Sequence, residues 1–509
     1  MFKKIFLFLT IFSLTVFATE AALNEKLTIV YWNDFHAQNT PMQTVKKNAD
    51  KSKDTVVEIG GTAALLGYIN TIRAEHQNNI LVLNAGDDFQ GTPISSITKG
   101  ASQIELMNMI RPNAVTLGNH EFDYGLENLN DVIQKAKYPV ICSNIIWSKS
   151  QKPFVQPYRI VTIKKLKIGI LGLMAPDLTL LTMKKNIEGI EVADIRTSAK
   201  KYIDSLHFLN ADIIILLSHM GIELDTTIAK EFPDIDIIVG GHSHTQLLYP
   251  IKKNKTIVVQ AGSRGAFLGT LDVDIDVQGD SIVKFDGRLI ETLTQNITPD
   301  SSVEKKVAAM EEQVNSALGE VIGTLQVNWE RRSGKRESNI GNWEADVIRK
   351  SCNTDIAFIN AGGIRKDLRA GPITLRDIWE INPFGNTLQI FSIHGDTLIQ
   401  MIMWQANIPS REFLIPSGIQ YLYNSELPKE EQNIIITMNG EHIENDSVYS
   451  ISTNNYVASH LYDFFGVRDE NITISETGII DRDAFIEEVR LQKNISSHIE
   501  GRVRDKKDE

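Results

Sequence analysis

The sequence predicts an α/β protein, a layered α+β arrangement in which a large N-terminal domain precedes a smaller α/β segment. Three observations support this prediction. Six apolar runs in the first half of the chain have the length and composition of strands buried on both faces. Helical patterns lie between some of these runs, at residues 60–77 and 196–211. From about residue 271 the pattern changes, which indicates a second structural unit.

The elements after residue 271 explain this change. Residues 269–293 alternate between apolar and polar side chains, as an exposed antiparallel hairpin does. Residues 301–323 form an amphipathic helical pattern with one charged face, which suits a connector between two domains. A second α/β pattern follows over residues 322–505.

Length and charge limit the class of protein. The chain has 509 residues, which indicates about three domains. Its formal net charge of -12 disfavours nucleic-acid binding, since such proteins carry a basic patch, and we expect no nucleic-acid partner. A small anionic ligand remains compatible, because local charge can oppose the total.

The N-terminus has the pattern of a secretory signal peptide. Lys3 and Lys4 precede an apolar run from Ile5 to Phe17, and small residues follow it. A membrane anchor is the alternative, but the run is shorter than the ~20 residues that a membrane span needs. We therefore expect residues 1–21 to be cleaved, with no stable membrane insertion afterwards and a periplasmic or secreted protein.

The chain contains two cysteines, Cys142 and Cys352, in the two different halves. Both lie beside apolar, strand-like runs. An exported protein could form a disulfide, but the distance between them in sequence favours two free, buried thiols. Neither resembles a metal ligand.

Polar side chains follow five of the six apolar runs directly. They are Asp34 and His36, Asp87 and Asp88, Asn119, His120 and Asp123, His219, and His242 and His244. The sixth run, residues 166–174, leads to no such group. In parallel sheets, ligands bind beyond the carboxyl ends of the strands, so we expect these side chains to meet. The other histidines, His460 among them, are expected to be surface or hydrogen-bonded interior residues.

So many polar groups at one sheet edge are hard to desolvate without a cation. Imidazoles and carboxylates without thiolates favour Zn, Mn, Fe or Co over Mg or Ca. The candidates are too numerous for one tetrahedral ion. The sequence therefore predicts two divalent metal ions, with Zn, Mn or Co as the expected identities. The alternative is that these residues only cap turns.

The ordered motifs carry a family resemblance. Asp34-Phe35-His36, Gly86-Asp87, Gly118-Asn119-His120-Glu121, His219 and Gly241-His242-Ser243-His244 resemble the calcineurin-like metallophosphoesterase signature. The stretches NDFHAQ, AGDDFQGTPIS and GNHEFDYG resemble more closely the secreted 5′-nucleotidases, which include bacterial periplasmic UDP-sugar hydrolases. The resemblance implies a four-layer β-sandwich flanked by helices at residues 22–298, a linker helix at 299–321 and a C-terminal substrate-binding α/β domain at 322–505.

The resemblance also implies residue roles in the N-terminal domain. One ion is expected at Asp34, His36, Asp87 and His244, and the other at Asp87, Asn119, His219 and His242, with Asp87 as the bridge. His120 is expected beside the phosphoryl group, where it stabilises developing charge. Asp123 is expected to orient the His120 imidazole, with a turn residue as the alternative.

In the C-terminal half, KRESNIGNWEADVIRKS and FINAGGIRKDLRAGPITLRDIWEINPFGNTL resemble the 5′-nucleotidase C-terminal domain. The resemblance implies phosphate binding by Arg336 and Arg365, with Arg332 as a third candidate. Asn360 is expected near the base, and Gly363 permits close approach of the backbone. Phe384 and Tyr456 are expected to sandwich the base. Asp463 is the candidate for ribose binding, although His460-Leu461-Tyr462-Asp463 replaces the family's Gly-Gly-Asp and leaves this contact open.

Together these features predict an exported two-metal phosphohydrolase that releases phosphate from nucleoside 5′-monophosphates. Nucleotide sugars and other nucleotides are further possible substrates. One alternative within the same fold is a 2′,3′-cyclic-nucleotide phosphodiesterase/3′-nucleotidase. An alternative of another class is a nucleotide-binding surface protein with a degenerate site. The sequence gives no oligomeric state.

Overall fold

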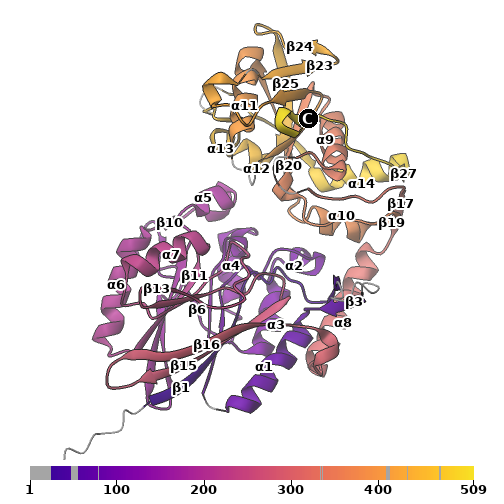
Figure 1. Cartoon of the computed structure of the whole chain (residues 1–509). Helices are drawn as coiled ribbons and strands as arrows, with labels where there is room; N and C mark the ends of the chain where they lie inside the picture. Colours follow the sequence, from indigo (N-terminus) through magenta and orange to yellow (C-terminus); the bar gives the residue numbers. More distant parts are fainter. Residues whose placement is uncertain are drawn as a thin grey trace, which may run out of the picture.

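The computed structural model describes residues 24–46, 55–77, 79–332, 334, 336–408, 413–432, 434–468 and 472–508. The predicted signal peptide, residues 1–21, lies outside these ranges. Figure 1 shows an N-terminal domain and a C-terminal domain joined along one side by a long helix. Within the described ranges, no helix has both the length and the apolar character required to cross a membrane.

The first large sheet of the N-terminal domain has the strand order β16-β15-β1-β4-β5-β6. Neighbours from β1 to β6 run parallel, while β15 and β16 form the predicted antiparallel hairpin. The strands are β1 (Asn24–Trp32), β4 (Ile80–Asn84), β5 (Ala114–Thr116), β6 (Val140–Ile141), β15 (Phe267–Asp276) and β16 (Ser281–Glu291).

The second large sheet has the order β13-β14-β12-β11-β9-β8. Its central strands β9, β11, β12 and β14 are parallel, and the two edge strands are antiparallel to their neighbours. The strands are β8 (Tyr158–Ile163), β9 (Leu166–Met174), β11 (Ile213–His219), β12 (Ile237–Val239), β13 (Ile251–Lys253) and β14 (Thr256–Val259).

The two sheets pack face to face and helices cover their outer faces, which gives four layers. Alternate residues of β1 illustrate the packing: Ile29 lies in the core between the sheets, whereas Val30 faces the helices. The second sheet repeats the pattern, with Ile170 inside and Leu171 outside. Both faces of these strands are buried, which explains why their sequences are continuously apolar.

Helices and smaller strands complete this domain. The helices are α1 (Thr62–His76), α2 (Pro93–Ile97), α3 (Ala101–Ile110), α4 (Leu126–Ile133), α5 (Leu178–Leu181), α6 (Ile195–Phe208) and α7 (Ile222–Glu231). Two short strand pairs are β2 (Met42–Lys46) with β3 (Thr55–Ile59), and β7 (Ile145–Trp147) with β10 (Ile190–Val192).

The C-terminal domain is built on a five-stranded mixed sheet of order β21-β18-β25-β20-β26. A four-stranded and a three-stranded sheet accompany it. The strands are β17 (Val321–Leu325), β18 (Ile356–Asn360), β19 (Gly371–Thr374), β20 (Thr387–His394), β21 (Leu414–Ser417), β22 (Gln420–Tyr423), β23 (Ile435–Met438), β24 (Glu441–His442), β25 (Val448–Asn454), β26 (Ser475–Ile480), β27 (Asn494–Ile495) and β28 (Val503–Asp505). The helices are α9 (Asn339–Cys352), α10 (Leu375–Ile381), α11 (Gly395–Asn407), α12 (Asn455–Ala458), α13 (Leu461–Phe465) and α14 (Asp481–Gln492).

The long helix between the domains is α8 (Ser301–Leu318), which begins where Asp300 accepts hydrogen bonds from the backbone N–H groups of Ser302 and Val303. Its apolar face is buried against the helical layer of the first sheet. Its Glu311 pairs with Arg376 of α10 in the C-terminal domain at 2.6 Å. The predicted fold class is thus confirmed, including the four-layer sandwich, the linker helix and the smaller α/β domain.

The prediction that the two cysteines form no disulfide is also confirmed, because both thiols are free. Cys142 is buried in the N-terminal domain. Cys352 at the end of α9 is only half-buried, so the expectation of full burial was wrong for this residue.

Candidate metal centre and substrate cavity

The predicted metal ligands come from the carboxyl ends of both large sheets. In the first sheet, β1 leads to Asp34 and His36, β4 to Asp87, and β5 to Asn119, which begins the 3₁₀ turn η1 (Asn119–Phe122). In the second sheet, β11 ends at His219 and β12 leads to His242 and His244. Because the parallel strands of both sheets end at one edge of the sandwich, seven side chains that are distant in sequence meet there.

The backbone at this edge is unusual. Positive φ angles occur at five of the predicted ligands, namely Asp34 (49°), His36 (50°), Asp87 (60°), His242 (73°) and His244 (53°). Few non-glycine residues adopt this region, and each costs free energy that the surrounding structure must offset. Such clustering is typical of functional sites.

Two glycines allow the loops to approach one another closely. A Cβ at Gly118 would lie 2.1 Å from Oδ1 of Asp87, and a Cβ at Gly91 would lie 2.0 Å from the carbonyl oxygen of His36. Neither position has room for a side chain. The glycine of the Gly-Asn-His-Glu motif is therefore required by the packing of the ligand loops.

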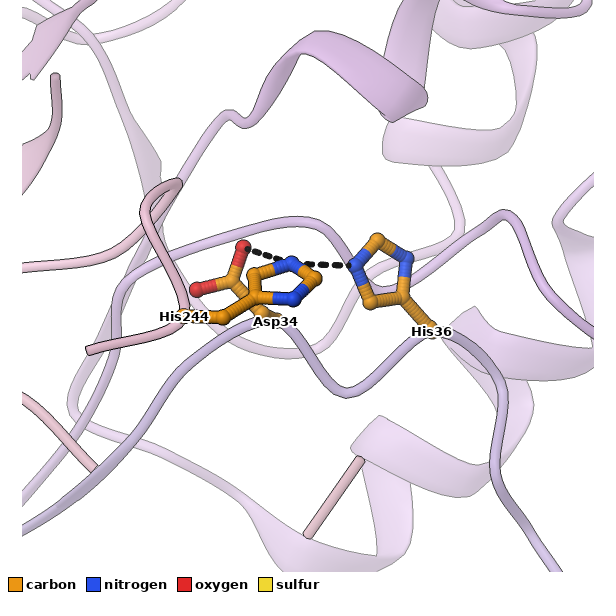
Figure 2. Close-up of side chains that lie close together, drawn as sticks. All are labelled: Asp34, His36 and His244. Carbon is orange, nitrogen blue, oxygen red and sulfur yellow. Dashed lines mark hydrogen bonds and ion pairs between the residues drawn. The ribbon is translucent and has the colours of Figure 1, made fainter. Parts of the chain in front are cut away.

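One group of ligand atoms consists of Asp34, His36 and His244 (Figure 2). Nε2 of His244 lies 3.3 Å from Oδ1 of Asp34 and 3.0 Å from Nε2 of His36. The other ring nitrogen of His36 lies 3.0 Å from the carbonyl oxygen of Gln90, which fixes the ring with Nε2 toward the group.

A second group consists of Asp87, His219 and His242. Nε2 of His219 lies 3.2 Å from Oδ2 of Asp87, and its Nδ1 lies 2.6 Å from the carbonyl oxygen of Ala85. Asn119 joins this group through its Oδ1 atom, 3.0 Å from Nδ1 of His242. A third combination, of His36, Asp87 and His120, links the two groups.

This donor set fits divalent metal ions. It offers imidazole nitrogens and carboxylate oxygens that lie within ligand spacing of one another inside each group, an amide oxygen beside the second group, and no thiolate. Asp87 lies close to both groups. The backbone carbonyls that hold His36 and His219 are the usual outer partners of metal-binding imidazoles. The arrangement therefore suits two ions that share Asp87.

Electrostatics at the two groups are dominated by burial and by Asp87. Although burial opposes ionisation, the neighbouring His219 and His120 hold the pKa of Asp87 well below its ordinary value. Burial would lower the pKa of His219, but Asp87 raises it to about 10. Burial and His219 lower the pKa of His242 to about 4, and burial holds the pKa of His36 well below its ordinary value. Asp87 is thus ionised beside His219 and His120, while the lowered pKa values of His36 and His242 favour their neutral forms, which is the form of imidazole that binds metals.

Two polar residues that sequence reasoning left without a role position the ligands. The buried carboxylate of Glu121 accepts hydrogen bonds from the backbone N–H groups of Asp87 (3.0 Å), Asp88 (2.7 Å) and Gly118 (2.6 Å), so it ties the two loops together. Asn33 donates to Oδ2 of Asp34 at 2.5 Å. Asp88, which follows the same strand as Asp87, accepts hydrogen bonds from the side-chain amide of Asn84.

His120 and Asp123 lie between the ligand groups and the C-terminal domain. Nδ1 of His120 is 2.7 Å from Oδ2 of Asp123. Burial lowers the pKa of His120, but the charges of Asp123 and Asp87 outweigh it and raise that pKa above its ordinary value. Nδ1 is engaged by Asp123, so Nε2 is the atom available to a ligand.

A cavity of about 350 Å³ adjoins these residues and is lined by both domains. The predicted site residues in its lining are Asp87, Asn119, His120, Asp123, His242, His244, Asn360, Gly363, Arg365, Phe384, Tyr456 and Asp463. Asp34, His36 and His219 lie buried beneath it. Arg336 and Arg332 are exposed and do not line the cavity, so the structure does not bring them to the other residues.

The aromatic residues of the cavity have distinct neighbours. The Phe384 ring lies 6.2 Å from the His120 ring and 5.8 Å from the Arg365 guanidinium, measured from ring centroids. The hydroxyl of Tyr456 donates to the carbonyl oxygen of Leu180 at 2.9 Å. The two predicted base-binding rings therefore occupy different walls, one beside the metal-ligand groups and one beside α5.

The segment after β9 was missed by sequence reasoning. That strand leads to no metal ligand, yet Asp177, Leu180, Leu181, Thr182, Met183 and Asn186 line the cavity. His460 also lines it and lies, through Nε2, 3.0 Å from the carbonyl oxygen of Thr179 across the domain boundary. His460 is hydrogen-bonded, as expected, but its position at the cavity was not predicted. The contacts use backbone carbonyls, which leave no pattern in the sequence.

The chain matches two family models. The model for calcineurin-like phosphoesterase covers residues 27–246, and the model for the 5′-nucleotidase C-terminal domain covers residues 321–466. Among solved structures, a 5′-nucleotidase precursor from Thermus thermophilus superposes with a TM-score of 0.83 at 28% identity, over 94% of this chain and 99% of that one.

Curated relatives agree with the family models. A snake venom 5′-nucleotidase of Gloydius brevicauda is 30% identical over 82% of this chain and 77% of its own length. Human 5′-nucleotidase is 27% identical over 94% of this chain and 91% of its own length. Endonuclease YhcR of Bacillus subtilis is 28% identical over 94% of this chain, which spans only 41% of that longer protein.

Proposed function

The chain belongs to the 5′-nucleotidase family, and we propose that it releases inorganic phosphate from nucleoside 5′-monophosphates. One observation carries this proposal: a single cavity runs from the candidate metal ligands to the aromatic residues of the C-terminal domain. Its volume is appropriate to a nucleotide-sized ligand. A substrate whose phosphate lies at one end and whose base lies at the other fits this lining.

The proposal assigns two divalent metal ions, Zn, Mn or Co, to the two ligand groups. Asp34, His36, Asp87 and His244 would hold one ion, and Asp87, Asn119, His219 and His242 the other. Ions bound there would supply Lewis-acid stabilisation of phosphoryl oxygens.

His120 is assigned to the phosphoryl end of the substrate. With Nδ1 engaged by Asp123, its Nε2 carries the proton that can stabilise charge on the phosphoryl group or pass to the leaving oxygen. The raised pKa of His120 favours the protonated form that this role requires. Asp123 orients the ring and stabilises its positive charge.

Arg365 is the cation best placed to bind the phosphate among the residues that line the cavity. Its planar donor fork suits phosphate oxygens. Arg336 would contact a substrate only after a movement that brings it to the cavity. Asn360, Gly363, Phe384, Tyr456 and Asp463 are assigned to the nucleoside, with the two rings on the base and Asp463 on the ribose.

We further propose that the protein is exported, with residues 1–21 removed. The apolar run after Lys3 and Lys4 supports this. N-terminal sequencing of protein recovered outside the cytoplasm would identify the cleavage site. An N-terminus that still begins at Met1 would contradict cleavage.

A substrate panel tests the proposed activity. Purified protein supplied with Mn, Co or Zn is assayed for phosphate release from 5′-AMP, 3′-AMP and 2′,3′-cyclic AMP, and a UDP-sugar is added to test the wider substrate class. We expect 5′-AMP to be the best of the three adenine nucleotides. Preference for 2′,3′-cyclic AMP or 3′-AMP would favour the phosphodiesterase alternative, and metal binding without turnover on any substrate would favour a degenerate binding protein.

A further inference from the structure

A second cavity adjoins the candidate metal centre on a different side from the nucleotide cavity. Its volume is about 440 Å³, and both domains line it, with His36, Gln38, Thr92 and Arg264 from the N-terminal domain and Arg365 and Glu380 from the C-terminal domain. Arg365 lines both cavities. A second space lined by charged and polar side chains therefore lies next to the metal-ligand residue His36.

The four basic residues that line this cavity differ in whether they form ion pairs. Lys366 and Arg376 also line it, but both pair with Glu380, at 2.5 Å and 2.6 Å. Arg376 pairs in addition with Glu311. For Arg264 and Arg365, no carboxylate lies within ion-pair distance among the residues that the structure describes. Arg264 and Arg365 thus have no direct carboxylate partner in the described part of the chain, and the charges of Asp87, Asp123 and Asp34 act on Arg365 only from a greater distance.

Arg264 is held in place by the backbone of Asp34, one of the candidate metal ligands. It lies in the loop between β14 and β15 with a φ of 56°, and its backbone N–H donates to the carbonyl oxygen of Asp34 at 2.7 Å. Its guanidinium donates to the carbonyl oxygen of Arg365 at 3.2 Å, across the domain boundary. Burial and the charge of Arg365 lower the pKa of Arg264 to about 10. Two like charges held near one another, with no carboxylate of the described residues in direct contact with either, indicate a site for an anion.

We propose that Arg264 and Arg365 form a phosphate-binding subsite in this second cavity, distinct from the metal centre. This inference rests on the proposed function for its biological meaning. Guanidinium forks bind phosphate oxygens in pairs. The side-chain amide of Gln38 adds a neutral donor to the lining, because its Nε2 has a second N–H besides the one donated to the carbonyl oxygen of Thr40. Two sources supply such a group: the inorganic phosphate released by hydrolysis, and a second phosphate of a longer nucleotide.

The main variant is Arg264→Asn, because asparagine tolerates the left-handed backbone at this position. Arg264→Lys keeps the charge but removes the planar fork. The matched control is Arg196→Asn, which removes the same charge from an exposed surface pair with Glu231. Far-ultraviolet circular dichroism and metal content show whether each variant folds and keeps its ions.

The first measurement does not require turnover. Isothermal titration of the metal-loaded, full-length protein with inorganic phosphate should show weaker binding in Arg264→Asn, by about tenfold, the loss expected for charge-assisted hydrogen bonds. Arg264→Lys should lie between this variant and the wild type, and Arg196→Asn should match the wild type. Wild-type affinity in a folded Arg264→Asn protein would overturn the subsite.

The second measurement separates the two sources. If the phosphate is the product, Arg264→Asn should weaken product inhibition by inorganic phosphate and leave the ratio of kcat/KM for 5′-ADP to that for 5′-AMP unchanged. If it belongs to the substrate, this ratio should fall. Unchanged inhibition together with an unchanged ratio would overturn the proposal. A wild-type protein that hydrolyses no nucleotide would refute the proposed function, while the titration would still decide the subsite.

Discussion

Nδ1 of His120 lies 2.7 Å from Oδ2 of Asp123, and both side chains are about one-seventh exposed at the wall of the nucleotide cavity. We propose that the chemistry of this pair depends on protonation rather than on metal binding. It lies between the metal-ligand groups and the Phe384 ring.

His120→Ala should lower kcat for 5′-AMP by about 10²–10⁴-fold, the usual contribution of a general acid or base. The bound metal, measured by inductively coupled plasma mass spectrometry, should stay close to the wild-type amount. Loss of metal in this variant would instead make His120 a ligand, in keeping with its closeness to His36 and Asp87.

Asp123→Asn should move the alkaline limb of the pH–rate profile to lower pH. Asp123 raises the pKa of His120, so its neutralisation lowers that pKa, and the protonated imidazole is lost earlier as the pH rises. The profile of kcat/KM for 5′-AMP checks this. An unshifted limb would indicate that Asp123 is only a turn residue.

Phe384→Ala should raise KM for 5′-AMP by about ten- to a hundredfold, because stacking on a base contributes about 1–3 kcal/mol. The control substrate is p-nitrophenyl phosphate, which has no base and should be nearly unaffected. Equal losses on both substrates would show that the ring serves packing, with its neighbours His120 and Arg365, rather than base binding.

Asp481→Asn should make the protein's stability less sensitive to pH. Burial raises the pKa of Asp481 to about 7 from an ordinary value of 3.8. Between these values the folded state keeps a proton that the unfolded state has lost, so the stability of the wild type falls as pH rises through this window.

The melting temperature Tm at pH 5 and pH 8 measures this effect. The fall in Tm should be at least about 3 °C smaller in Asp481→Asn than in the wild type. Asp131→Asn is the matched control, because Asp131 is exposed, and its Tm should fall as in the wild type. Equal falls in Tm in all three proteins would contradict a raised pKa of the buried Asp481 carboxyl.

The core strands and the grouping of the metal ligands could be predicted because both follow from local rules. Strands buried on both faces are continuously apolar, as Ile29 and Val30 of β1 show, and parallel strands place their carboxyl ends at one edge. The recognition of the family followed from the ordered motifs after these strands and is confirmed by the comparisons.

The parts that could not be predicted depend on contacts between domains. Thr179 and Leu180 take part in the site through backbone carbonyls that accept from the C-terminal domain, so their side chains give no pattern. Arg336 is exposed and lies outside the lining of the cavity, and its sequence motif does not encode its distance from the cavity. Glu121 has its role through four loop N–H groups, which only the folded turn brings together.

The central claim is that two metal ions at the shared carboxylate Asp87 are needed for phosphate release from a nucleoside 5′-monophosphate. The most direct test measures metal content and 5′-AMP hydrolysis together, in wild-type protein that has been chelated and then reloaded, and in Asp87→Asn. We predict that chelation abolishes activity and that activity returns as two ions per chain are restored. Asp87→Asn should lack at least one ion and remain inactive. Full hydrolysis of 5′-AMP by the metal-free wild-type protein would contradict the claim.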